Sequence, residues 1–152
     1  MNTLHLILAG CLIVSSSCFA GSKAGWDDDY EKTLAKAKTE GRSVLLDFTG
    51  SDWCGWCIKL DNEVFTKPAF KRFAKERLLL VELDYPQGKR LSRKTQEQND
   101  ELKTKYGVSG FPTIVLLSPE GKEVKRWSGY SAKFFDELKA AVPAEPKATA
   151  AK

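Results

Sequence analysis

One stretch decides how this chain folds: Ser43-Val44-Leu45-Leu46-Asp47-Phe48-Thr49-Gly50-Ser51-Asp52-Trp53-Cys54-Gly55-Trp56-Cys57. Its first half is an apolar run with glycines on both sides, which predicts a buried strand over 43–48. A short polar loop then leads to Cys54 and Cys57, where a helix is expected to begin. Residues three apart at the start of a helix share one face, so the two sulfurs can join and part without movement of the backbone. The pair therefore predicts thiol–disulfide chemistry.

Two other roles for a cysteine pair fit this sequence less well. A structural disulfide that closes so short a loop does little to restrain the unfolded chain. A zinc site needs about four ligands, whereas the chain beyond residue 20 offers two thiols and no histidine, so a metal would require a second subunit. We therefore expect no metal and no cofactor. A binding module for unfolded chains, which uses the fold without turnover, stays open as an alternative.

The first twenty residues have the pattern of a signal peptide. An apolar run from Leu6 to Val14 is followed by small residues up to Ala20, after which we expect cleavage. Spanning a bilayer takes about 18 to 20 apolar residues, so we expect an exported, periplasmic protein rather than one with an uncleaved anchor. No Lys or Arg precedes the apolar run, and Leu8-Ala9-Gly10-Cys11 is similar to a lipoprotein box, so a lipid anchor at Cys11 is the alternative.

The chain has room for one domain. Between leader and tail lie about 120 residues, a common single-domain size, and we expect a signal peptide at 1–20, one domain at 21–142 and a disordered tail at 143–152. All charged residues lie beyond Ala20 and sum to a net charge of +4. This excess is mild, and its densest part, from Lys89 to Lys94, is interpreted as a solvated loop. Nothing in the pattern indicates nucleic-acid binding.

Periodicity along the chain predicts helices and strands in alternation. Helices are expected over about 27–40, from the cysteines onward with an interruption near Pro68, over about 94–106, and after a cap at Ser131. Strands are expected over 43–48, 78–84, 113–117 and 123–128, of which the last two form a hairpin. Strands that alternate with helices pair in parallel through helical crossovers. The predicted fold class is therefore α/β, with a central mixed sheet of four to five strands flanked by helices.

This order of elements, with the cysteines at the first strand-to-helix junction, resembles the thioredoxin fold. A second, separate match is Tyr106-Gly107-Val108-Ser109-Gly110-Phe111-Pro112-Thr113, which is similar to the family's Tyr-Gly-Val-x-Gly-x-Pro-Thr. Within the superfamily, the segments 50–60 and 82–86 look most like exported thioredoxin-like reductases of the DsbH type. The resemblance implies an exported thiol-disulfide oxidoreductase that reduces protein disulfides.

The resemblance also implies how the cysteines divide the work. Cys54 would be the exposed attacking thiolate and Cys57 the shielded resolving thiol. Elementary chemistry favours the same assignment, because free amides at the start of a helix stabilise a thiolate at Cys54. Pro112 corresponds to a cis proline of the family, and the backbone of Phe111 would bind an incoming peptide as an added strand.

The residues between and before the cysteines are expected to contact substrate. Trp56 would form an apolar platform for unfolded chains, whereas Trp53 would mainly pack over the active-site helix, and Gly55 is assigned to the same surface. The pair Gly55-Trp56 departs from the Gly-Pro of thioredoxins and from the histidine-containing pairs of oxidases and isomerases. Without a histidine to stabilise the thiolate, we expect a reductase, with disulfide oxidase or isomerase as alternatives.

Asp47 matches the buried acid that in this family helps to move the proton of the resolving thiol. An unpaired buried carboxylate is costly or takes up a proton. The sequence departs from the family at two points: the loop from Asp47 to Cys54 is one residue longer than in ordinary thioredoxins, and Glu82 stands where many members carry a lysine. We expect Glu82, if it points inward, to raise the pKa of Asp47 by repulsion between like charges.

The expected partners follow from a reducing role outside the cytoplasm. Substrates would be exported proteins with disulfides. Electrons would come from a membrane thiol donor, because exported thiols have no cytosolic glutathione pool to draw on. No segment indicates dimerisation, which favours a monomer.

Overall fold

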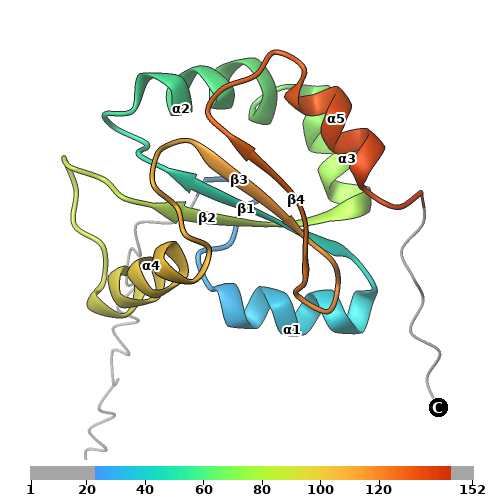
Figure 1. The fold of residues 1–152 in the computed structure, drawn as a ribbon, viewed down its shortest axis with the longest axis horizontal. Coiled ribbons are helices and arrows are strands. Elements are labelled where there is room, and N and C mark those ends of the chain that lie inside the picture. Colours follow the sequence, from blue (N-terminus) through green and yellow to red (C-terminus); the bar gives the residue numbers. More distant parts are fainter. Residues whose placement is uncertain (1–22, 145–152) are drawn as a thin grey trace, which may run out of the picture.

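The computed structural model describes residues 23–144. The expected signal peptide, the lipid-anchor alternative at Cys11 and the part of the expected tail beyond residue 144 lie outside the described residues. Within them, a four-stranded sheet in the order β2-β1-β3-β4 separates two layers of helices (Figure 1). The number of strands agrees with the sequence-based prediction.

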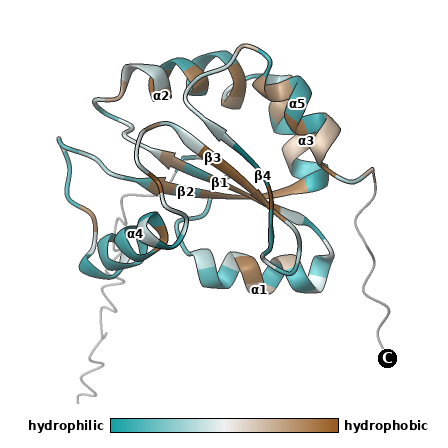
Figure 2. Ribbon diagram, viewed as in Figure 1, coloured by the Kyte–Doolittle hydropathy of each residue, from teal (hydrophilic) through white to brown (hydrophobic). Residues whose placement is uncertain are grey.

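The four strands are β1 (Ser43–Thr49), β2 (Leu78–Asp84), β3 (Thr113–Leu117) and β4 (Glu123–Ser128). β1 pairs in parallel with β2 and antiparallel with β3, and β3 pairs antiparallel with β4. Every residue of β1 and β3 is buried, and Figure 2 shows hydrophobic residues concentrated in these central strands. The mixed sheet and the parallel crossover are confirmed, and β1 lies in the interior with its C-terminal end leading directly to the cysteines.

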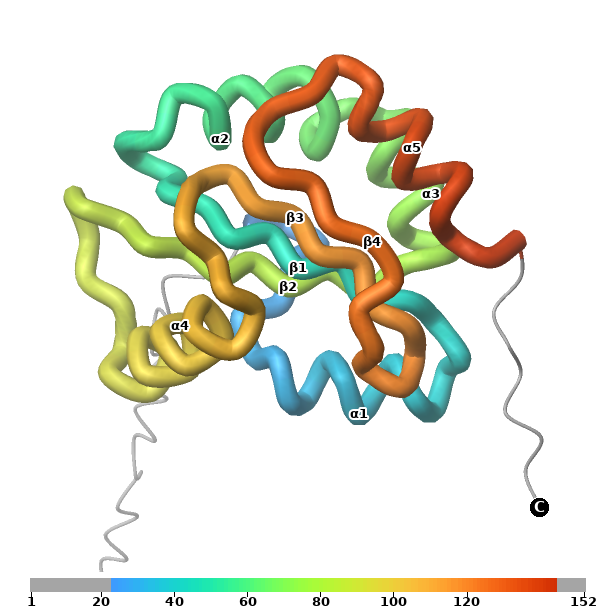
Figure 3. The backbone as a smooth tube through the Cα atoms, viewed as in Figure 1, coloured from blue at the N-terminus to red at the C-terminus, as the bar shows by residue number. Residues whose placement is uncertain are grey.

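The helices are α1 (Tyr30–Glu40), α2 (Gly55–Leu60), the π-helical turn η1 (Asp61–Phe65), α3 (Pro68–Arg77), α4 (Arg93–Lys105) and α5 (Phe134–Ala141). α1 and α4 cover one face of the sheet, and α2, η1, α3 and α5 cover the other (Figures 1 and 3). No helix among residues 23–144 is long and apolar enough to cross a membrane.

Two predicted helix starts were wrong. α1 begins at Tyr30 and not at Asp27, because the backbone N–H of Asp27 donates to Leu80 and its carbonyl accepts from Glu82, which holds Asp27 extended against the edge of β2. Ser131 does not cap α5. Its hydroxyl accepts from the N–H of Lys133 at 3.2 Å in a turn that precedes the helix, and Lys133 occupies the N-cap position.

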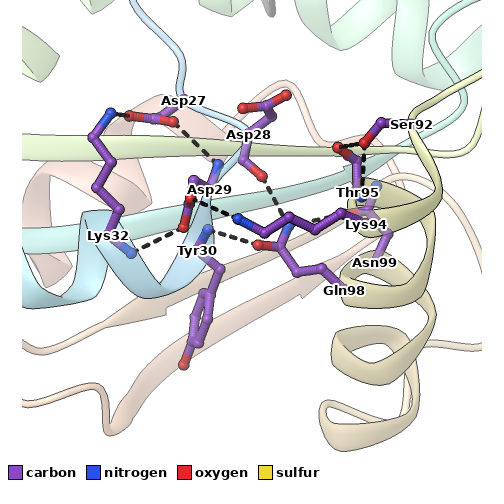
Figure 4. A network of polar contacts seen from close by, with 10 residues as sticks. All are labelled: Asp27, Asp28, Asp29, Tyr30, Lys32, Ser92, Lys94, Thr95, Gln98 and Asn99. Atoms are coloured by element: carbon purple, nitrogen blue, oxygen red, sulfur yellow. Dashed lines mark hydrogen bonds and ion pairs between the residues drawn. The ribbon is translucent and has the colours of Figure 1, made fainter.

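A polar network joins α1 to α4 (Figure 4). The carboxylate of Asp29 accepts from the N–H of Lys32 at 3.0 Å and caps α1. The side chain of Gln98 on α4 accepts from the N–H of Tyr30 at 3.0 Å and donates to the carbonyl of Asp28 at 2.8 Å. One side chain thereby ties the start of α1, and the segment before it, to a helix that follows almost seventy residues later in the chain.

Alternation along β1 sends its side chains into two separate cores. Val44, Leu46 and Phe48 pack toward α1 and α4. Leu45 packs toward α2, η1 and α5, and Asp47, two residues further on, faces the same way. The fold therefore directs the buried carboxyl of Asp47 toward the helix that begins at the cysteines.

Candidate active site

Cys54 and Cys57 are joined by a disulfide with an Sγ–Sγ distance of 2.10 Å. Cys54 is the N-cap residue of α2, and its Sγ accepts from the N–H of Cys57 at 3.2 Å. The expectation of an exposed Cys54 was wrong in degree, because its residue is only 7% exposed against 4% for Cys57. The hydrogen bond from the Cys57 N–H explains why Cys54 is less exposed than expected, since it turns the Cys54 sulfur back onto the helix. An N–H in this position stabilises negative charge on Cys54 when the disulfide opens.

Trp53 is held by the loops around the cysteines rather than by the active-site helix. A Cβ on Gly50 would lie 2.5 Å from Cε2 of Trp53, so the indole can rest there only on a glycine. The Nε1–H of Trp53 donates to the carbonyl of Tyr85 at 2.7 Å, and its ring meets Phe111 edge to face at 5.8 Å. The predicted packing role of Trp53 holds, with partners other than the predicted helix.

The long loop before Cys54 is fastened to the loop that follows β2, and Figure 3 shows the two side by side. Asp52 accepts from the N–H groups of Gln87 and Gly88 at 3.0 and 2.6 Å, and these bonds lower the pKa of its carboxyl. Asp84 accepts from the N–H and the hydroxyl of Ser51 at 2.9 and 2.7 Å. Ser51 and Asp52 thus fix the middle of this loop to the segment after β2.

Trp56 projects from the first turn of α2 and is 59% exposed. Its ring stacks on Tyr130 at 5.7 Å, and the Lys59 ammonium lies over both rings, 5.4 Å from Trp56 and 4.7 Å from Tyr130. The Tyr130 hydroxyl binds the carboxylate of Glu63. Gly55, at the start of the same helix, has no atom within 4 Å of where a Cβ would stand. Trp56 and Tyr130 together form an exposed aromatic surface, which we call the aromatic platform.

The peptide bond between Phe111 and Pro112 is cis. The carbonyl of Pro112 accepts from the N–H of Gly129 at 2.8 Å, which holds this turn against the loop after β4. The ring of Phe111 lies 5.0 Å from Tyr85 and also contacts Trp53, the residue before Cys54. Phe111 therefore contacts the cysteine segment through the ring of Trp53.

Asp47, on the strand that leads to the cysteines, is 3% exposed. Its register partner on β2 is Glu82, and Lys23 Nζ lies 3.9 Å from Asp47 Oδ2 and 3.7 Å from Glu82 Oε1. Burial raises the pKa of Asp47 to about 7, Lys23 opposes this rise, and Glu82 adds to it. The expectation that Glu82 raises the pKa of Asp47 is confirmed in direction, with burial as the larger cause. Burial also raises the pKa of Glu82 itself.

Sequence reasoning missed three residues of this region. Asp61 stands four residues after Cys57, a spacing that places both on one helix face and could have indicated it. Lys23 lies before the first helix, in a segment without periodicity, and Tyr130 lies in a loop, so no local pattern indicated either. Among residues 23–144, no group of His, Cys, Asp and Glu is arranged to hold a metal ion.

A disulfide at the start of a helix that directly follows the first strand, in a sheet of order β2-β1-β3-β4, defines a protein of the thioredoxin fold with a redox-active pair. Residues 30–142 match the thioredoxin-like domain family, and the chain belongs to it. It is a thioredoxin-like oxidoreductase.

Individual relatives show which members of the thioredoxin-like family this chain is similar to. The disulfide bond reductase DsbH of Chlamydia pneumoniae is 32% identical over 153 residues, which cover 88% of this chain and 92% of the relative. A solved structure of a DsbH oxidoreductase superposes with a TM-score of 0.70 at 34% identity and covers 88% of this chain and 94% of its own. The thioredoxin-related protein DsbJ of Chlamydia pneumoniae is 34% identical over 101 residues, 66% of this chain but only 29% of that protein. The chain is thus homologous to a disulfide bond reductase along most of both lengths.

Proposed function

We propose that this protein is an exported reductase of protein disulfides that works through Cys54 and Cys57. The observation that carries the proposal is the setting of the disulfide, with the exposed Trp56 between its two cysteines and the buried carboxyl of Asp47 on the strand that precedes them. The similarity to DsbH favours reduction over oxidation or isomerisation. The absence of a histidine between the cysteines supports the same direction.

In the proposed reaction, the Cys54 thiolate attacks one sulfur of a substrate disulfide, and the other substrate sulfur leaves as a thiolate and takes up a proton. Cys57 then passes its proton to the Asp47 carboxylate and attacks Cys54 Sγ. The bond between Cys54 and the substrate breaks as the 54–57 bond forms, and the second substrate sulfur leaves as a thiolate. The substrate gains two electrons and the cysteine pair loses two.

The substrate is proposed to bind as an extended peptide. The backbone of Phe111, next to the cis bond to Pro112, would pair with it in the manner of an added strand. Trp56, with Gly55 beside it, would cover apolar side chains of the substrate, and Trp53 would hold the Phe111 turn in place.

We further propose the place and partners of this activity. The protein would be exported to the periplasm and cleaved after Ala20, or alternatively anchored through a lipid at Cys11. It would act as a monomer on exported proteins with disulfides and be recharged by a membrane thiol donor.

The first test is the redox equilibrium of the purified protein against glutathione buffers, followed by tryptophan fluorescence. A reductase is expected near about −270 to −220 mV, whereas a value near about −120 mV would indicate an oxidant that donates its disulfide. Reduction of insulin by the wild type but not by Cys54→Ser tests turnover. Tight binding of unfolded chains by Cys54→Ser, without reduction by the wild type, would instead indicate the binding module.

A further inference from the structure

A cavity of about 320 Å³ is lined by residues of β1, β2, α2 and η1. Three carboxyl groups from three elements line it: Asp47 from β1, Glu82 from β2 and Asp61 from η1. One ammonium group from the segment before α1, that of Lys23, contacts all three. A single cation thus stands between the buried acid of the proposed mechanism and two further acids.

The position of Lys23 is held from several sides. Its Nζ donates to Asp61 Oδ1 at 2.6 Å and lies 3.9 Å from Asp47 Oδ2. The same ammonium lies over the rings of Trp26 at 4.2 Å and of Phe65 at 4.7 Å. Lys23 is only 24% exposed, so its charge is weakly screened by solvent and acts on its neighbours at short range.

The remaining charges of the cavity act less directly on Asp47. Lys89 also lines the cavity, but its ammonium lies 2.9 Å from Asp84 Oδ2 and is largely engaged there. Asp84 and Asp61 both disfavour a charge on Asp47, and they are less influential than Glu82. Lys23 is therefore the main group in the cavity that favours the ionised form of Asp47, and Glu82 is the main charged group that disfavours it.

We propose that Lys23 is a positioning residue of the reductase: its ammonium sets the proton affinity of Asp47 and thereby the pH range in which Cys57 can give up its proton, and Glu82 acts in the opposite sense. This inference rests on the proposed function, in which Asp47 accepts the Cys57 proton. The segment before the first helix, with its backbone paired to the edge of β2 at Asp27, then belongs to the catalytic apparatus.

The direct test is the NMR titration of the Asp47 carboxyl carbon in the oxidised protein. Lys23→Met is expected to move the midpoint upward by about one pH unit, because a cation within about 4 Å favours the ionised form. Glu82→Gln is expected to move the midpoint downward. Lys23→Arg keeps the charge and should restore the wild-type value, and Lys36→Met removes an exposed lysine of α1 as the matched control. A Lys23→Met midpoint that stays at the wild-type value overturns the proposal.

The second readout is the rate of the resolving step as a function of pH. When the reduced protein reacts with a small aromatic disulfide, the second thiolate released reports the attack by Cys57. The acid limb of this rate should move to higher pH in Lys23→Met and to lower pH in Glu82→Gln, opposite shifts that loss of packing would not produce. If the acid limb stays at the wild-type pH in both variants, this inference alone is overturned. If the wild type exchanges no disulfide, the proposed function is overturned.

Discussion

The two faces of the sheet bury polar groups in different ways. On the face covered by α1 and α4, the hydroxyls of Tyr30 and Tyr106 bond to each other at 3.0 Å. Burial, with this bond, raises the pKa of Tyr106, so its hydroxyl keeps its proton. On the face covered by α2, Asp47 is equally buried, and its nearest cation, Lys23, lies 3.9 Å away.

The two faces differ in the free-energy cost of burying their polar groups. Two hydroxyls that hydrogen-bond to each other can be buried at little cost in free energy. A buried carboxylate is costly to ionise, and the cost shows as a pKa near neutrality, where a proton can be taken up and released. One face therefore buries a hydrogen-bonded pair, and the other, which we call the chemical face, buries the acid of the proposed mechanism.

The largest expected effect tests the chemical face at its centre. Cys54→Ser is expected to lower disulfide reduction by roughly three orders of magnitude or more, because the attacking thiolate is gone. Cys57→Ser keeps the attack but not the resolution, so a covalent adduct with substrate should accumulate. Mass spectrometry after mixing with a disulfide peptide detects the adduct. Reduction by Cys54→Ser at the wild-type rate would break the assignment.

Asp47→Asn removes the cost that distinguishes the two faces. Burial raises the pKa of Asp47 from its ordinary 3.8 to about 7. The protonated side chain therefore makes its full contribution to stability below about pH 4, and this contribution is lost as the pH rises to about 7. Above pH 7, the free energy of unfolding of the variant should exceed that of the wild type by up to about 4 kcal/mol. At about pH 4 the two values should be nearly equal. Urea unfolding of the oxidised protein at both pH values measures this.

The same variant should be slower as well as more stable. Without a carboxylate to take the Cys57 proton, the resolving step at pH 7 is expected to fall by about a hundredfold. Stopped-flow release of the second thiolate measures it. A variant that is stabilised yet resolves at the wild-type rate would separate the buried acid from the chemistry and contradict the mechanism.

The aromatic platform tests whether the chemical face also selects its substrate. Trp56→Ala and Tyr130→Ala are each expected to raise KM for a reducible protein by about tenfold at most, because a contact between rings contributes about 1 kcal/mol. Reduction of a small aromatic disulfide should stay unchanged. Val124→Ala, an exposed apolar side chain on β4, is the matched control. Equal losses on both substrates would argue against a platform.

The smallest effect is expected on the opposite face. Gln98→Ala loses the two bonds that join α4 to the start of α1 and should lower the free energy of unfolding by about 1 kcal/mol. Disulfide exchange should not change. Gln96→Ala, on the exposed side of α4, is the control for helix propensity. A change in the exchange rate of Gln98→Ala would show that the two faces are not separate in function.

Much of this architecture was predictable because it depends on short-range patterns. The buried strand over 43–48, the hairpin of β3 and β4 and the helix at Cys54 follow from apolar periodicity and turn residues. The two wrong helix starts have different causes, one local and one long-range. Ser131 has the chemistry of a helix cap, but a turn intervenes before α5, and Asp27 looks helical until its backbone pairs with β2.

The sequence by itself determined the cysteine pair, its place at a strand-to-helix junction and the acid on the preceding strand, since each depends on residues a few positions apart. Only the tertiary structure decided what surrounds the pair. Lys23 meets Asp61 across 38 positions, and Trp56 meets Tyr130 from a distant loop. Such contacts leave no periodic trace in a sequence, because they exist only when the sheet has brought separate segments together.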